Sequence, residues 1–253
     1  MNAPSGILAP DWPAPARIRA AVTTREIAGA SQAPFESFNL GAHCGDDPAA
    51  VASNRAALTR LLDLPDEPRW LRQVHGTDVA VFDAASRAPQ ADPIVADASI
   101  ARAAGVVLAV LTADCLPLLV CAEDGSEIAA IHAGWRGLAA GAIDRCIETL
   151  RAPRGKLLVW LGPAIGAASY EVGIDVRDAF LAIDAGNAEA FAATRPGHWQ
   201  CDLYALARRR LAALGVTRVY GGGFDTFADA RFYSYRRAPR SGRFASLIWI
   251  AAE

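Results

Sequence analysis

The chain has 253 residues, of which 53% are hydrophobic and 21% charged, and its formal net charge is -2. This length and apolar content are enough to bury a sizeable core, so we expect a globular protein. The 25 basic residues include a single lysine, Lys156, and form no basic tract, which argues against a nucleic-acid partner. The longest uncharged apolar stretch, 103–113, is far shorter than the roughly 20 residues that span a bilayer, so we expect no membrane segment.

The spacing of the cysteines and the N-terminal residues indicate the cellular compartment in which we expect the protein. The five cysteines show no CxxC spacing, and the N-terminal segment lacks the basic and apolar regions of a secretory signal. We therefore expect reduced thiols and a cytoplasmic protein.

The predicted elements begin with a strand at 17–24, followed after a polar loop by a helix that starts at Pro48 with Asp47 as its N-cap. Apolar patterning then predicts strands at 69–74, 78–82, 106–111, 116–121 and 127–132, and a helix at 137–150. The second half predicts a strand at 156–161, a Gly/Pro turn at 161–166, helices near 174–184 and 202–214, and strands near 216–220 and 244–250. No linker or repeat interrupts this pattern, so we expect one α+β domain over residues 1–253, with mixed β-sheets flanked by helices.

Three side chains that can bind metals lie at or just after the ends of apolar segments. His75 and His132 lie in Gly-bounded segments that we place in turns after strands, and Cys115 precedes Pro117, which we expect to break the strand. Two imidazoles and a thiolate suit Zn²⁺, and three protein ligands would leave its fourth position open for catalysis.

The residues alone leave other readings of Cys115 open. A free cysteine is most often a small buried residue, and a thiolate beside His75 or His132 could instead serve as the nucleophile of a metal-free hydrolase. Both chemical readings require a thiolate near an imidazole, so spacing does not choose between them.

Several uncommon strings, in order, resemble one family almost from end to end. They include QVHGTDV (73–79), ADA (96–98), LTADCLPLL (111–119), HAGWRGL (132–138), LGPAIG (161–166), YEVG (170–173), FYSYRR (232–237) and SGRFASLIWI (241–250). The chain resembles the YfiH-like or laccase-domain proteins, also described as peptidoglycan-editing factors and as purine nucleoside phosphorylases. This resemblance implies a layered α/β/β/α fold, and it implies that His75, Cys115 and His132 are zinc ligands.

The resemblance also implies an activity. It points to phosphorolysis of adenosine, inosine, guanosine and methylthioadenosine and to deamination of adenosine, with nucleoside and phosphate as small-molecule partners of a monomer or weak oligomer. Asp114 is then our candidate for moving protons, and Arg25 and Arg136 are our candidates for binding phosphate. His43 is expected to line the cleft, with Trp135 either stacking on a purine or packing as an anchor.

Other functions stay open from the sequence. The family also includes hydrolases that remove serine-substituted muramyl nucleotides, and a zinc-holding module without turnover is a third hypothesis. Direct polyphenol oxidation by a multicopper cluster is disfavoured because the chain has only four histidines, although copper could occupy the triad in vitro. One departure from the family is Asp225, which stands where relatives often carry an additional cysteine.

Overall fold

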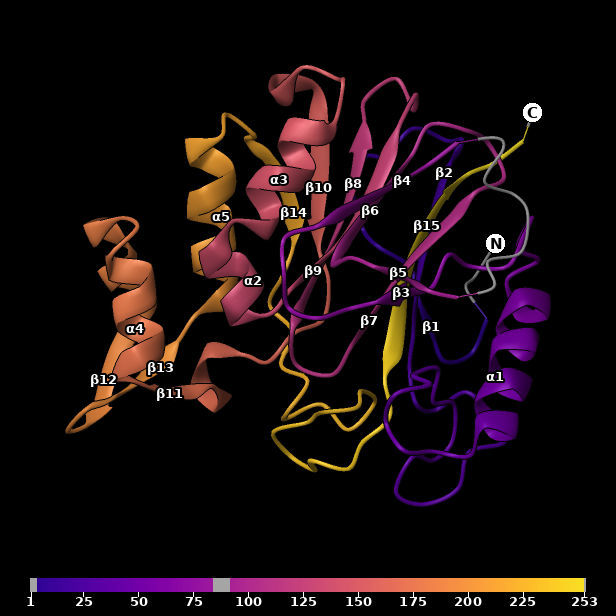
Figure 1. Cartoon of the computed structure of the whole chain (residues 1–253), viewed down its shortest axis with the longest axis horizontal. Coiled ribbons are helices and arrows are strands. Elements are labelled where there is room, and N and C mark those ends of the chain that lie inside the picture. The colour runs from indigo at the N-terminus through magenta and orange to yellow at the C-terminus, as the bar shows by residue number, and fades with distance from the viewer. Residues whose placement is uncertain (1–3, 84–91, 253) are drawn as a thin grey trace.

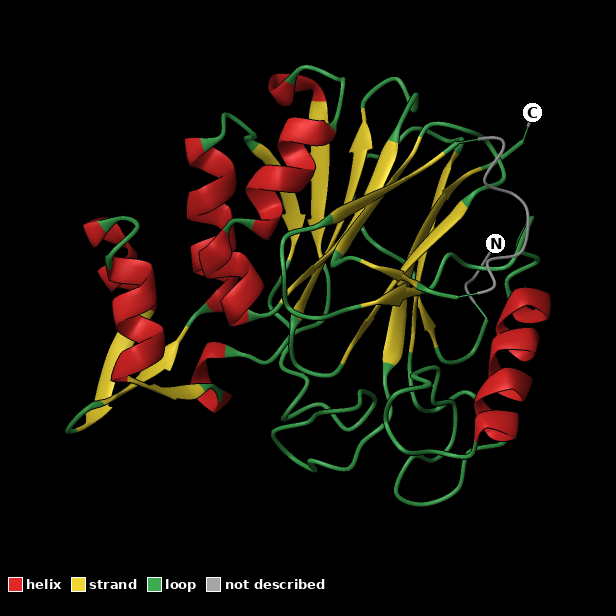
Figure 2. Cartoon of the chain, in the orientation of Figure 1, coloured by secondary structure: helices red, strands yellow, loops and turns green. Residues whose placement is uncertain are grey.

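The computed structural model describes residues 4–83 and 92–252, with two β-sheets at its centre (Figures 1 and 2). The smaller sheet is antiparallel, in the order β1 (Ile7–Leu8), β2 (Ile18–Thr23), β15 (Phe244–Ile250) and β7 (Val107–Thr112). The larger sheet is mixed, in the order β14 (Arg218–Gly221), β10 (Leu157–Leu161), β8 (Leu116–Ala122), β9 (Ile128–Ala133), β6 (Ala98–Ala101) and β4 (Val79–Phe82).

Helices cover the outer faces of both sheets (Figure 2). The smaller sheet is covered by α1 (Pro48–Leu61), and the larger by α2 (Trp135–Ala140), α3 (Ala142–Thr149) and α5 (Leu203–Ala213). At the left edge of Figure 1, α4 (Ile174–Leu181) accompanies a third sheet made of β11 (Glu171–Gly173), β13 (His198–Cys201) and β12 (Phe191–Arg195). A two-stranded sheet pairs β3 (Leu71–Arg72) with β5 (Ile94–Val95), and short 3-10 turns occur at Arg154–Lys156, Ala167–Ser169 and Ala185–Ala190. The expected α/β/β/α layering is confirmed.

Three apolar cores separate these layers. Alternate residues of β8 point to opposite sides, so that Leu118 packs under the helices of the larger sheet and Leu119 packs between the two sheets. On β7, Leu108 likewise joins the core between the sheets, whereas Ala109 faces the core under α1. Because both faces of these strands are buried, their sequences read as continuous apolar runs.

Most predicted elements are present, and two expectations are wrong. Asp47 caps α1 by accepting a hydrogen bond from the Ala49 amide at 2.9 Å, as expected. The single helix expected at 137–150 is two helices, because Gly141 adopts a φ of 95° and ends the first. Pro117 does not break its strand: it is the second residue of β8 and lies opposite His132.

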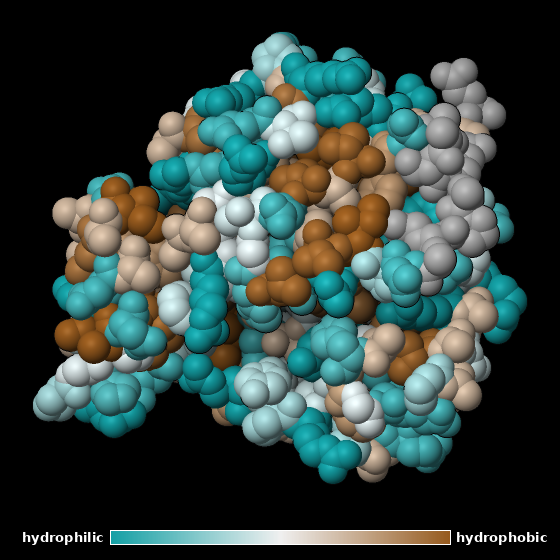
Figure 3. Space-filling view, viewed as in Figure 1, coloured by the Kyte–Doolittle hydropathy of each residue, from teal (hydrophilic) through white to brown (hydrophobic). Residues whose placement is uncertain are grey.

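The elements that sequence patterning missed are short strands. The third sheet, β11 to β13, has partly exposed strands of three to five residues, which give little periodic signal. No helix of the described residues is long and apolar enough to cross a membrane. An apolar strip on the surface lies over β3, β4 and β5 (Figure 3), where four large hydrophobic side chains are exposed: Val74, Val81, Ile94 and Val95.

Candidate metal centre and active-site cleft

Three elements bring the predicted triad together. Cys115 is the residue before β8, His132 is the penultimate residue of β9 rather than part of the following turn, and His75 lies in the turn after β3. Because β8 and β9 are neighbours in the larger sheet, Cys115 and His132 meet at the same end of it. The ligand atoms of the three residues lie within 4.8 Å of one another, and Cys115 Sγ is 3.7 Å from His75 Nε2.

The backbone around the triad is strained at two residues. His75 has a φ of 60° and Asp114, next to Cys115, has a φ of 87°, both in the left-handed region that residues with a side chain rarely adopt. Strain of this kind persists only where surrounding contacts impose it, and it is concentrated at functional sites.

Gly134 provides the space in which the triad converges. A Cβ at this position would lie 2.7 Å from His75 Cδ2 and 2.9 Å from Cys115 Sγ, far inside van der Waals contact. Only glycine therefore lets the strand-to-helix connection pass this close to both ligands. Two imidazole nitrogens and one thiol sulfur that lie within 4.8 Å of one another form a donor set that fits Zn²⁺.

A buried carboxylate supports two of these side chains. Asp97 accepts a hydrogen bond from His132 Nδ1 at 2.7 Å and others from the backbone amides of Val74, His75 and Gly76. Burial opposes ionisation of Asp97, but these bonds outweigh it and lower the pKa of its carboxyl group. Asp97 is therefore a carboxylate at neutral pH.

Electrostatics favour the charged forms of Cys115 and His132. Burial alone would raise the pKa of the Cys115 thiol, but the charge and hydrogen bond of His132, helped by His75, lower it to about 6. Burial alone would lower the pKa of His132, yet Cys115 and Asp97 raise it to about 9. Without a metal, the pair is therefore a thiolate and an imidazolium near neutral pH.

The triad opens into a cleft of about 490 Å³, within the range of roughly 300–1,000 Å³ that is typical of small-molecule sites. Three arginines line it, and each lies over an aromatic ring of the same cleft: Arg136 over Trp135, Arg236 over Tyr170 and Arg243 over Tyr235. None of the three forms an ion pair with a carboxylate within the described part of the chain. The cleft therefore offers cationic groups to an anion.

Two further site residues predicted from the sequence, His43 and Asp114, also line the cleft. His43 lines the cleft, and burial, followed by the nearby Arg243 and Arg55, lowers its pKa. Asp114 also lines the cleft, but its two oxygens accept hydrogen bonds from the Thr226 hydroxyl and the Arg236 amide.

Arg25 lies outside the residues that line the cleft. It donates to the Glu36 carbonyl, pairs with the Glu36 carboxylate at 3.4 Å and lies over the Tyr233 ring. The structure thus brings together every predicted site residue except Arg25.

Asp225, the departure from the family pattern, connects two loops. Its carboxylate accepts hydrogen bonds from the Ser169 hydroxyl at 2.6 Å and from the amides of Gly166 and Phe227. An additional thiol is therefore replaced here by a carboxylate that holds the 161–166 turn against the 223–229 loop.

Sequence reasoning missed several residues of the cleft. Gln73, Tyr170, Tyr235, Arg236 and Arg243 line it, and none was assigned a role from the sequence. All five fall inside the uncommon strings quoted above, and that membership is the signal that could have identified them.

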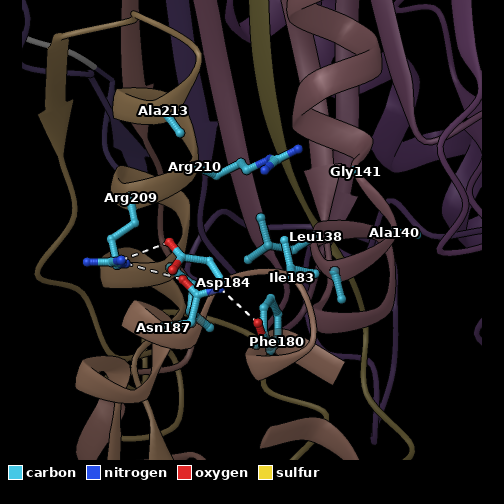
Figure 4. Close-up of a pocket in the computed structure, with 12 residues that line it drawn as sticks. Leu138, Ala140, Gly141, Phe180, Ile183, Asp184, Asn187, Arg209, Arg210 and Ala213 are labelled. Carbon is cyan, nitrogen blue, oxygen red and sulfur yellow. Dashed lines mark hydrogen bonds and ion pairs between the residues drawn. The ribbon is translucent and has the colours of Figure 1, made fainter. Parts of the chain in front are cut away.

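A second pocket, of about 270 Å³, lies between α2, α4 and α5 (Figure 4). Its arginines are already paired: Arg209 contacts Asp184 at 2.9 Å, and Arg210 binds Asp144 through two nitrogens. No cluster of metal ligands includes residues of this pocket within the described ranges. The cleft at the triad is therefore the stronger candidate for chemistry.

Comparison with known proteins agrees with this site. A family model described as "Multi-copper polyphenol oxidoreductase laccase" matches residues 19–251. The chain is 55% identical over 248 residues to a purine nucleoside phosphorylase of Pseudomonas aeruginosa, covering 96% of this chain and 98% of that protein. It is 45% identical over 247 residues to the purine nucleoside phosphorylase YfiH of Escherichia coli K12, covering 97% and 99%.

Solved structures share the whole fold. Protein NMB0706 of Neisseria meningitidis superposes with a TM-score of 0.92 at 44% identity, covering 98% of this chain and 100% of that one. YlmD from Geobacillus stearothermophilus gives a TM-score of 0.91 at 30% identity, covering 100% and 98%. The layered arrangement of mixed sheets is therefore common to these proteins.

Proposed function

The chain belongs to the family described as multi-copper polyphenol oxidoreductase laccases, and from this premise and its relatives we propose that it is a zinc-dependent purine nucleoside enzyme. Its proposed reactions are phosphorolysis of adenosine, inosine, guanosine and methylthioadenosine, and hydrolytic deamination of adenosine. The observation that carries the proposal is a single cleft that contains both a His/Cys/His triad and three arginines free of carboxylate partners in the described residues.

Zinc suits the donor set of the triad. His75, Cys115 and His132 would hold the ion, and their number is typical of catalytic zinc sites, whose fourth position stays open. When bound, a catalytic zinc ion polarises water or a substrate oxygen at that position. The copper in the family's name has weaker support, because four histidines are too few for a multicopper cluster.

The cleft arginines would bind phosphate. Arg136, Arg236 and Arg243 each lie over an aromatic ring, which leaves the in-plane N–H donors open to other partners. Arg236 and Arg243 use only Nη1, on backbone carbonyls, so that Nε and Nη2 can donate to an anion. We therefore assign the phosphate subsite to these three residues in place of Arg25, whose guanidinium already contacts Glu36.

Proton transfer during deamination is assigned to His43. Its lowered pKa keeps the imidazole neutral at pH 7, so that it can accept a proton from water or from the nucleoside. Asp114 is less suited to this task, because Thr226 and the Arg236 amide already donate to its carboxylate. Its proposed role is to hold the strained turn that presents Cys115.

The test compares two reactions in the same variants. Replacing Arg136 with Ala should raise the KM for phosphate in adenosine phosphorolysis at least tenfold, whereas phosphate-free deamination should change much less, since only phosphorolysis binds a phosphate dianion. Arg145→Ala, at an exposed residue of α3, is the control and should leave both reactions unchanged. Initial rates with varied phosphate measure the effect, and Arg25→Ala tests the residue that the sequence suggested.

Two results would reject the proposal. Equal losses of both reactions in Arg136→Ala would mean that this arginine binds the nucleoside or supports the fold. No turnover of any purine nucleoside by the zinc-loaded protein, together with hydrolysis of the serine-bearing muramyl nucleotide, would instead favour the precursor-editing hydrolase.

A further inference from the structure

Asp97 contacts both histidines of the triad, although sequence reasoning gave it no role. It lies directly before β6, is fully buried, and accepts four hydrogen bonds from two segments that are distant in sequence. Oδ1 accepts from His132 Nδ1 at 2.7 Å and from the His75 amide at 2.9 Å. Oδ2 accepts from the amides of Val74 and Gly76 at 3.1 and 2.7 Å.

On the His132 side, this contact determines which ring nitrogen is free. An ionised carboxylate can only accept hydrogen bonds, so His132 Nδ1 must carry the proton that it donates to Asp97. The lone pair of a neutral ring is then left on Nε2, the nitrogen available to a metal. The ring is also fixed through the backbone, because the His132 amide donates to the Asp97 carbonyl at 2.7 Å.

On the His75 side, the same carboxylate holds an unfavourable turn. Three consecutive amides, from Val74 to Gly76, point at the two Asp97 oxygens, and His75 between them has a φ of 60°. These hydrogen bonds offset the backbone strain at His75. Without the carboxylate, the amides would lose their acceptor and the turn would lose the contacts that impose its conformation.

We propose that Asp97 is the positioning residue of the metal centre, fixing the tautomer of His132 and the turn of His75 through one carboxylate. The proposal rests on the metal centre of the proposed function, but it concerns metal binding and requires no particular substrate.

Replacement of Asp97 with Asn is informative because a side-chain amide cannot accept hydrogen bonds both from His132 and from the backbone amides of Val74 and Gly76. If its oxygen faces His132, its NH₂ group opposes the amides of Val74 and Gly76; if it is flipped, it donates to His132 Nδ1 and moves the ring proton to Nε2.

The experiment measures Zn²⁺ affinity by competition with a chromophoric chelator, independently of turnover. Asp97→Asn should weaken Zn²⁺ binding by about 10- to 100-fold, the usual effect of losing a group that orients a metal-bound histidine. Asp97→Glu keeps the acceptor chemistry but displaces it by one methylene, so its affinity should fall between those of Asp97→Asn and the wild type. In spectra of the zinc-saturated protein, the Nδ1–H resonance of His132 should shift or exchange faster in Asp97→Asn.

Glu127 supplies a matched control. It is also a buried carboxylate that accepts two backbone hydrogen bonds, from Arg151 and Ala152, and it pairs with Arg102 away from the triad. Glu127→Gln should lower thermal stability without changing Zn²⁺ affinity or the His132 resonance. Wild-type affinity in either folded Asp97 variant, or an equal loss in Glu127→Gln, would overturn the proposal.

If Asp97→Asn does not fold, Asp97→Glu decides the matter by the same two measurements. Loss of nucleoside turnover alone does not bear on it. A chain whose zinc affinity depends on Asp97 but that converts no nucleoside would reject the proposed function and leave this inference standing.

Discussion

At the scale of single residues, the local environment separates Cys115 from the other cysteines. Burial raises the pKa of Cys121 and Cys201 to about 12 and also raises the pKa of Cys44 and Cys146. For Cys115 alone the neighbouring imidazoles outweigh burial, so its thiolate forms at neutral pH. The other four therefore stay protonated at neutral pH, and Cys115 is the cysteine whose surroundings favour the thiolate that binds a metal.

Replacement of Cys115 with Ser tests this assignment. A serine hydroxyl has a much higher pKa than a thiol, so it should coordinate zinc poorly, and zinc content and adenosine turnover should fall together while the thermal unfolding stays cooperative. Cys44→Ser, at a half-buried cysteine outside the triad, should keep about one zinc per chain. Lost turnover with full zinc content in Cys115→Ser would indicate a nucleophile, and normal values of both would return Cys115 to a packing role.

The sequence named the triad and, beside it, His43, Asp114 and Arg136, but it gave no role to Asp97 or Arg236, for a physical reason. His75, Cys115 and His132 have side chains whose chemistry is recognisable in isolation. Asp97 and Arg236 acquire roles only through contacts across the fold: Asp97 reaches His132 35 residues away, and Arg236 donates to the Glu171 carbonyl 65 residues away. Such roles depend on tertiary packing, which local patterning does not contain.

At the scale of elements, the junction of β9 and α2 leaves the space in which the three triad residues come together. The connection between His132 and Trp135 runs through Gly134, where an added Cβ would meet both His75 and Cys115. The sequence predicted a strand followed by a helix here, but it placed His132 in the turn. The difference arises because β9 pairs with β8 as far as Ala133, whereas its pairing with β6 ends at Ile131.

Replacement of Gly134 with Ala should therefore damage the metal centre. The added methyl must displace His75 or Cys115 by several tenths of an ångström, so zinc affinity should fall at least tenfold and the metal-free protein should lose about 1–3 kcal/mol of stability. Isothermal titration and urea unfolding measure the two effects. Gly155→Ala, where nothing lies within 4 Å of an added Cβ, is the control. Unchanged zinc binding in Gly134→Ala would show that the triad tolerates a wider separation.

At the scale of the whole molecule, the layers and the site are energetically separate. The three apolar cores contain none of the triad residues, which lie before the start of β8, near the end of β9 and in the turn after β3. Continuous apolar runs predicted the central strands, but which strands form which sheet is determined by pairings such as β15 between β2 and β7, over long sequence separations. With its cores intact, the chain should stay folded after chelation of the metal.

The metal-free protein offers a test of the charge state at its centre. Lowering the pKa of Cys115 from 9.0 to about 6 contributes stability that is complete above pH 9 and is lost as pH falls to about 6. Raising the pKa of His132 from 6.5 to about 9 contributes stability that is complete below pH 6.5 and is lost as pH rises to about 9. The two slopes have opposite signs over almost the same interval, so they cancel.

We therefore expect a thiolate that titrates without a matching change in stability. In chelator-treated protein, thiolate absorbance near 240 nm should appear with a midpoint near pH 6, because Cys115 releases its proton to solvent while His132 stays an imidazolium and stabilises the thiolate. The difference in unfolding free energy between this protein and a Cys115→Ser, His132→Gln double variant should stay constant from about pH 6.5 to 9, measured by urea denaturation. A difference that changes steadily across this interval, or a thiolate midpoint near 9, would mean that the thiolate and the imidazolium do not stabilise each other, and that the closeness of Cys115 and His132 reflects packing alone.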